Sequence, residues 1–311
     1  MSEADWLARL PVIGDLPPAE AAVKLREVGE DDLADAVDAA AQAAPATYGV
    51  LSRIGIGGDR AWLHTAHAVG FLGPAPAPGQ GADLLPIRHA ASITPDHALK
   101  GGRVKVTLDG VRVADYPGRG MHRILFDFAA RNQTDQGAEQ LHFNATCRAA
   151  EGEQAAILGR PVFTGLQVGG EGIFLQLATV NVANEGDEKL LAFLDSDVFK
   201  GGLQLLTTAQ PTLAPFSAVA VGLTQAIAAR NRNVAVQAVD LGLDFSQVAL
   251  RPRLAEGSYI AVQVPETIRT VWDWQDWAYD PAAGRLVSTA EPGLLIPYNY
   301  LVVSVSRYQG P

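Results

Sequence analysis

From about residue 100 onward, hydrophobic side chains recur at every second position in one short segment after another. Val104, Val106 and Leu108 begin the pattern, which returns at residues 122–131, 139–149, 161–168, 172–182, 233–245, 257–265 and 298–308. A two-residue period places successive side chains on opposite faces of a strand. Short strands separated by turn residues predict antiparallel sheets, so this part of the chain is constrained to a β-sandwich or an open barrel.

Two of these segments carry additional signals. Asp109-Gly110 separates the alternating residues 104–108 from 111–116, and Asp-Gly is typical of a two-residue hairpin turn. We therefore expect a hairpin at Asp109. The C-terminal segment 301–308 is hydrophobic on both faces, which predicts either a central strand or a strand that a partner covers.

Helical patterns flank and interrupt the strands. Residues 17–45 have the spacing of two short helices joined at Gly29, with acidic residues in the first turn of the second. Residues 188–199 and 214–231 predict helical insertions within the β-rich part. The fold class we expect is α+β and predominantly antiparallel β, with a β-sandwich-like domain preceded by a small helical region.

The clearest linker is the segment 73–81, which has three prolines, three glycines and no charge. We therefore divide the chain into a mainly helical N-terminal region (1–75), a Pro/Gly-rich connection (76–99) and a β-sandwich-like domain (100–311).

Composition narrows the possible partners and compartments. The 311 residues are 48% hydrophobic, which suffices for a core, and the net charge is −10 with scattered basic residues, which argues against nucleic-acid binding. Cys147 is the single cysteine, so no internal disulfide can form. The uncharged segment 211–229 contains prolines and polar residues and predicts a buried helix instead of a membrane span. We expect a cytoplasmic protein, and the excess of Arg over Lys suggests a bacterial source.

The most unusual local feature is the segment 271–279, where three of the five tryptophans fall within six residues. Read as a strand, it places Trp272 and Trp274 on one face and Asp273 on the other. One interpretation is an aromatic plug at the end of the sandwich. The other is a binding surface, because tryptophan is enriched among the residues that dominate binding energy. The candidate ligand- or partner-binding residues are Trp272, Asp273, Trp274, Asp276, Trp277, Tyr279 and Asp280.

The same segment allows a calcium, lipid or carbohydrate site. Over fewer than a dozen residues it is similar to the acidic calcium loops of C2 domains, in which carboxylates from two loops at one end of a β-sandwich bind the ion. That resemblance implies Asp273, Asp276 and Asp280 in one loop, with Asp195 and Asp197 as partners. Calcium takes six to eight oxygen ligands, which clustered carboxylates supply. Indole rings also stack on sugars, so a glycan is an alternative ligand.

A catalytic alternative rests on the histidines between residues 64 and 97, namely His64, His67, His89 and His97. His64 and His67 would share one face of a helix and are the only weak metal candidates, whereas on a strand they would point apart. No nucleophile motif, phosphate loop or paired carboxylate stands out, so we predict no catalytic residue and no cofactor. A hydrolase or metal-dependent enzyme using residues 64–97 remains the alternative.

Asparagines near strand ends, Asn144, Asn181, Asn184 and Asn299, are expected to satisfy turn backbone groups. Together these observations predict a non-catalytic binding or assembly protein that acts through protein–protein recognition. Its partner would be another protein or a second copy of the chain, with the tryptophan segment or the helical hairpin as the anchor.

Overall fold

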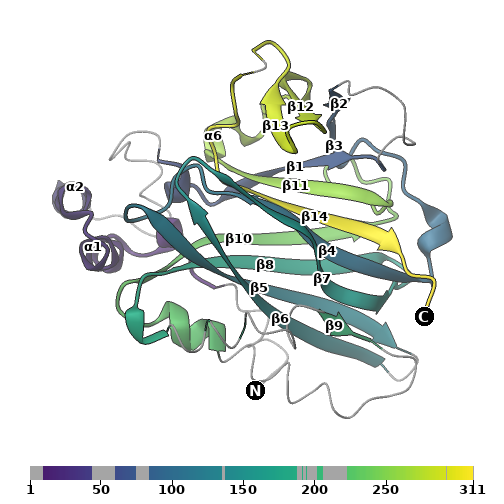
Figure 1. Cartoon of the computed structure of the whole chain (residues 1–311), viewed down its shortest axis with the longest axis horizontal. Coiled ribbons are helices and arrows are strands. Elements are labelled where there is room, and N and C mark those ends of the chain that lie inside the picture. Colours follow the sequence, from purple (N-terminus) through teal and green to yellow (C-terminus); the bar gives the residue numbers. More distant parts are fainter. Residues whose placement is uncertain are drawn as a thin grey trace.

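Two antiparallel sheets lie face to face and share one hydrophobic core (Figure 1). The computed structural model describes residues 10–43, 60–74, 84–134, 137–187, 191, 194, 202–205, 223–291 and 293–310. The fold is α+β and mostly antiparallel β, with a β-sandwich-like body and small N-terminal helices, as the alternating hydrophobic pattern predicts.

The larger sheet has seven strands in the order β3-β1-β11-β14-β4-β7-β9, and its neighbours run antiparallel except for β7 and β9. Its strands are β1 (Ala66–Leu72), β3 (Arg88–His89), β4 (Arg103–Arg112), β7 (Gln154–Gln167), β9 (Leu203–Gln204), β11 (Gly257–Val264) and β14 (Tyr300–Arg307). The smaller sheet has the order β10-β8-β5-β6, with β5 (Met121–Thr134), β6 (Gly137–Ala150), β8 (Gly172–Val182) and β10 (Asn233–Asp244). The predicted pairing of residues 122–131 with 139–149 is confirmed as the β5–β6 hairpin.

The hairpin predicted at Asp109-Gly110 is wrong. Strand β4 continues through both residues, and Asp109 is the extra residue of a β-bulge against β14, where Val302 pairs with Gly110 and Val303 with Leu108. A β-bulge inserts an extra residue into a continuing strand, and a glycine inside a strand often marks one. The Asp109 carboxylate also has side-chain partners within the sheet, Thr107 and Ser304, so it is not needed as a turn residue.

The C-terminal strand is hydrophobic on both faces because both faces are covered within the chain. β14 lies between β11 and β4 in the larger sheet. Leu301, Val303 and Val305 belong to the core between the sheets. Tyr300 and Val302 pack into a second cluster on the outer face. Of the two predicted explanations, the central strand is therefore confirmed.

The predicted helical hairpin is present as α1 (Pro18–Glu27) and α2 (Asp31–Ala43). Gly29 between them has φ of +82°, a left-handed conformation that glycine adopts at little cost. Buried residues of both helices, including Leu25 and Val37, belong to the core that the sheets share.

The three-part division of the chain stays a prediction. β1, which lies within residues 1–75, pairs along its whole length with β11 from the C-terminal part. The helical insertions are described only in part: residues 223–228 are helical, as are the isolated positions Leu191 and Leu194. Leu191, Leu194 and Ile227 pack with Leu125 and Val180 on the outer face of the smaller sheet. Among the described helices, none has the length and hydrophobicity to cross a membrane.

A pair of buried amides connects the two sheets. Gln263 on β11 donates through Nε2 to the backbone oxygens of His64, at 2.6 Å, and of Val236, at 2.9 Å. Val236 is the extra residue of a β-bulge in β10, where the register shifts between Ala235 and Gln237, and a bulged residue is unpaired in the ladder. Its carbonyl is therefore available to the opposite sheet.

The second amide, Asn299, holds the connection between β4 and β5. Its Oδ1 accepts from the backbone nitrogens of Ala114 and Asp115, and its Nδ2 donates to the Asp115 oxygen and to Gln263 Oε1, all within 3.0 Å. Asn299 is fully buried. The structural role expected of this asparagine is confirmed.

We expect Asn299→Leu to lower the free energy of unfolding by about 3 kcal/mol or more, because three part-buried backbone groups and the buried Gln263 amide lose their partner. Urea denaturation measures the change. Gln275→Ala, at an exposed position, is the control and should stay within about 0.5 kcal/mol of the parent. An Asn299→Leu effect as small as that of the control would contradict the role assigned to this amide.

Candidate functional site

The tryptophan segment belongs to a small module on the outer face of the larger sheet (Figure 1, top). A three-stranded sheet in the order β13-β12-β2 forms it, together with α6 (Glu266–Arg269) and a 3₁₀ turn, η5 (Trp274–Asp276). Its strands are β2 (Leu85–Pro86), β12 (Trp277–Asp280) and β13 (Arg285–Ser288). We call residues 84–87, 266–291 and 293–298 the aromatic module.

Trp274 fixes the aromatic module to the larger sheet. Its side chain is 3% exposed and packs in a cluster with Ile87 and residues of β11 and β14. Gly70 on β1 provides the space, because a Cβ there would lie 2.8 Å from two atoms of the indole ring and 2.7 Å from Ile87. Two polar contacts add to this packing, from Arg112 Nε to the Ile296 oxygen and from Gln154 Nε2 to the Gly284 oxygen.

The three tryptophans form one aromatic cluster, in which Trp272 and Trp277 are stacked, and they do not lie on a single strand. Trp272 stacks on Trp277 with ring centroids 5.8 Å apart and planes 6° apart. Trp272 also makes T-shaped contacts with Trp274 and Tyr298. The strand arrangement considered for 271–279, with Trp272 and Trp274 on one face, is not formed, since β12 starts only at Trp277 and the three preceding residues form η5. The turn lets Trp274 point into the molecule while Trp272 and Trp277 remain half-buried.

Acidic side chains of the aromatic module accept hydrogen bonds from backbone nitrogens of its turns. Asp273 Oδ1 accepts from the Gln275 nitrogen, and Asp280 Oδ1 accepts from the nitrogens of Ala282 and Ala283. No ion pair joins Asp273, Asp276 or Asp280 to a cation in the described part of the chain. The described residues also contain no group of three or more side chains able to hold a metal ion. Asp195 and Asp197, the other half of the predicted calcium loop, lie outside the described residues.

Hydrophobic side chains project from the aromatic module into solvent. Val271 is 72% exposed, Leu294 50% and Leu84 38%. They make up three of the seven large exposed hydrophobic residues in the described part, and they accompany the half-buried Trp272 and Trp277. Tyr279, the remaining candidate, is half-buried on β12 against the same cluster.

The histidines of residues 64–97 occupy separate structural positions. His67 is on β1, and His64 precedes that strand with its ring against Tyr298, so the helix that would align them is not formed. His89 Nδ1 accepts from the Ala91 nitrogen, and burial lowers the pKa of His89. His97 stacks on Phe245. Each contact is a packing or turn interaction of the fold.

A titratable cluster that the sequence pattern did not reveal joins the helical hairpin to the sheets. Arg60 binds Asp115 at 2.9 Å and Glu30 at 3.4 Å, and Glu30 also accepts from the Gly118 nitrogen. Burial raises the pKa of Asp115 to about 6, against the opposing effect of Arg60. Groups with strongly shifted pKa values often mark functional sites. The Asp115 carboxylate, however, pairs with Arg60, and the Asp115 backbone is hydrogen-bonded to Asn299. These contacts give Asp115 a structural role.

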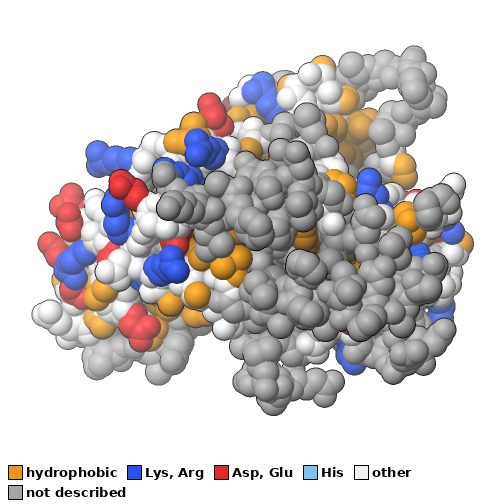
Figure 2. Space-filling model, turned by 60° about the horizontal axis from the view of Figure 1, so that its bottom comes forward, with side chains coloured by type: hydrophobic (Ala, Val, Ile, Leu, Met, Phe, Trp, Pro, Cys, Tyr) orange, Lys and Arg blue, Asp and Glu red, His pale blue; other side chains and the backbone are white. Residues whose placement is uncertain are grey.

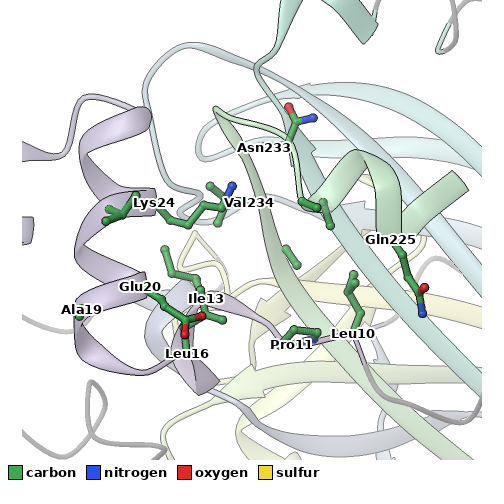
Figure 3. Close-up of a pocket in the computed structure, with 14 residues that line it drawn as sticks. Leu10, Pro11, Ile13, Leu16, Ala19, Glu20, Lys24, Gln225, Asn233 and Val234 are labelled. Atoms are coloured by element: carbon green, nitrogen blue, oxygen red, sulfur yellow. The ribbon is translucent and has the colours of Figure 1, made fainter. Parts of the chain in front are cut away.

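A pocket of about 640 Å³ was also not evident from the sequence (Figure 3). It lies between α1, the helix at 223–228 and β10, and we call it the α1 pocket. Ile13, Leu16, Val23, Ala228 and Val234 form much of its wall, and Glu20 and Lys24 are its charged residues. On the face in Figure 2, acidic and basic side chains intermingle over the hairpin at the left, and hydrophobic ones gather beside it. The lining comes from segments more than 200 residues apart, so no local sequence motif predicts the pocket.

No family model, curated protein or solved structure matches this chain. The two candidate functional surfaces of the chain are the aromatic module and the α1 pocket.

We expect Gly70→Ala to displace the aromatic module, because the added methyl group overlaps the Trp274 ring. The near-ultraviolet circular dichroism of the tryptophans should weaken, and the melting temperature should fall. Gly293→Ala is the matched control within the module, since a Cβ there meets nothing within 4 Å. Equal spectra for the two variants would refute the anchoring role of Trp274.

Asp115 should make stability depend on pH in the direction opposite to an ordinary salt-bridged carboxylate. Its pKa is raised from 3.8 to about 6 in the folded state, so folding favours the protonated form. This contribution is complete below about pH 4 and is lost as the pH rises to about 6. Asp115→Asn lacks it, so the stability of the variant relative to the parent should improve from about pH 4 to about pH 7. A constant difference in chemical denaturation across that range would contradict the assignment.

Proposed function

We propose that this is a non-catalytic recognition protein that binds a protein segment carrying hydrophobic and basic side chains on its aromatic module. The observation that carries the proposal is the combination of exposed hydrophobic residues with half-buried, stacked indoles on one small unit. Contiguous exposed hydrophobic surface on a folded protein marks an interaction site, and tryptophan contributes most to such sites.

The construction of the aromatic module supports a binding role. Trp274 anchors it from below, so Trp272 and Trp277 are held in a fixed stack by their contacts with one another and with Tyr298. Rigid aromatic side chains lose little conformational entropy when a partner covers them. The centroid separation of 5.8 Å between the parallel rings leaves no space for a ligand between them. A partner would therefore lie across the exposed edges of the stack, beside Val271.

Charge suggests which partner fits. Asp273 and Asp276 are exposed beside the stack, and no described cation pairs with either carboxylate. A basic side chain gains from both the carboxylates and the indole faces, since cations are attracted to aromatic rings. The overall charge of −10 acts in the same direction at long range.

The test uses labelled synthetic peptides in which leucine alternates with lysine, glutamate or serine, measured by fluorescence anisotropy. We expect the lysine peptide to bind most tightly. The double variant Val271→Ser and Leu294→Ser should weaken its binding by about tenfold, because both side chains are exposed and contribute little to the fold. Asp276→Lys should weaken it further and reduce its dependence on salt.

The matched control is the double variant Val248→Ser and Leu250→Ser, which removes exposed hydrophobic residues from a different loop. It should leave binding unchanged. Equal losses in the two double variants, or equal affinity for the lysine and glutamate peptides, would overturn the proposal.

A further inference from the structure

We propose that the α1 pocket binds a single-chain amphiphile with an anionic head group, of the class of a medium-chain fatty acid. This site is separate from the aromatic module and does not depend on its function. The pocket of about 640 Å³ falls within the usual range for small-molecule sites, about 300–1,000 Å³.

The walls of the pocket suit a hydrocarbon chain. Ile13 and Val234 are buried core residues that form its floor, and Leu16, Val23 and Ala228 extend it toward the surface. Val23 is 54% exposed. A bound chain would remove this side chain from water, and each buried methylene favours binding.

Lys24 supplies the recognition element for the head group. Its ammonium donates to Glu27 at 3.1 Å and to the Arg230 oxygen at 2.9 Å, and its side chain is 20% exposed. An ammonium group has three donors, so one remains for a ligand. In Figure 3 the Lys24 side chain extends from α1 toward Val234, whereas Glu20 lies near Leu16. The two opposite charges therefore differ in position, and an anionic head is favoured at the Lys24 end.

Polar contacts fix the Lys24 end of the pocket. Glu27 also accepts from the Arg232 nitrogen, and Arg230 forms an ion pair with the buried Asp187. Asn233 donates to Asp187 and to the Ile227 oxygen and is fully buried. These bonds hold the turn after the helix at 223–228 against α1, so the Lys24 end is preorganised and little order has to be created on binding.

The experiment is calorimetric titration with hexanoic, octanoic, decanoic and dodecanoic acids and with decanol. We expect affinity for the acids to rise about fourfold per added methylene until the pocket is full. Lys24→Met should weaken decanoate binding by about tenfold and leave decanol binding unchanged. Lys24→Arg should retain decanoate binding, which separates loss of the charge from damage to the fold. Glu20→Gln should strengthen decanoate binding about twofold, because a neighbouring negative charge is removed.

Ala19→Trp, an exposed lining residue on α1, should block both ligands, whereas Ala39→Trp, an exposed alanine of α2 that does not line the pocket, should not. Three results would each overturn the proposal. They are absence of binding, equal effects of the two tryptophan variants, and a decanoate affinity that is the same in Lys24→Met as in the parent. Sedimentation with vesicles of anionic phospholipid is the last arm. Binding to vesicles without binding to monomeric decanoate would assign Lys24 to a membrane surface and likewise refute the pocket.

Discussion

The fold depends on two buried amides, Gln263 and Asn299, that satisfy backbone groups which no strand ladder can satisfy. One carbonyl comes from the bulge at Val236 in the smaller sheet, and the others come from the segment before β1 and the connection after β4. In a dry interior each unsatisfied group would cost about 1–3 kcal/mol. Hydrophobic packing brings the two sheets together without direction, whereas these bonds fix the register in which they meet.

With that register fixed, the larger sheet has two hydrophobic faces to cover. The smaller sheet covers the inner face, and the aromatic module covers part of the outer face through Trp274. The helical hairpin and the helix at 223–228 close other sides of the sandwich, through Leu25 in one core and Ile227 in another. Both proposed binding surfaces therefore belong to elements that cover the sheets. One is the exposed side of the aromatic module, and the other is the α1 pocket, which lies between α1, the helix at 223–228 and β10.

The sequence predicted what depends on local spacing. The two-residue period located the long strands, and Gly29 marked the break between the helices, because both are properties of neighbouring residues. The hairpin prediction at Asp109-Gly110 is wrong because glycine is common in both turns and β-bulges, and only the pairing with the neighbouring strand distinguishes the two. Trp272–Trp277 identified an aromatic cluster, but which indole is buried depends on Gly70, some 200 positions earlier. Asp115 and the α1 pocket are assembled from distant segments and carry no local signal.

The two surfaces are coupled to the core to different degrees. The residues Val271 and Leu294 of the aromatic module are largely exposed, so a partner that binds there adds contacts without changing the core. The α1 pocket has Ile13 and Val234 in its wall, and both belong to the core that the sheets share with α1. A ligand that binds only the folded pocket stabilises that whole assembly by mass action. A partner bound only to the folded aromatic module stabilises the protein by the same rule, so a rise in stability alone does not tell which of the two surfaces is occupied.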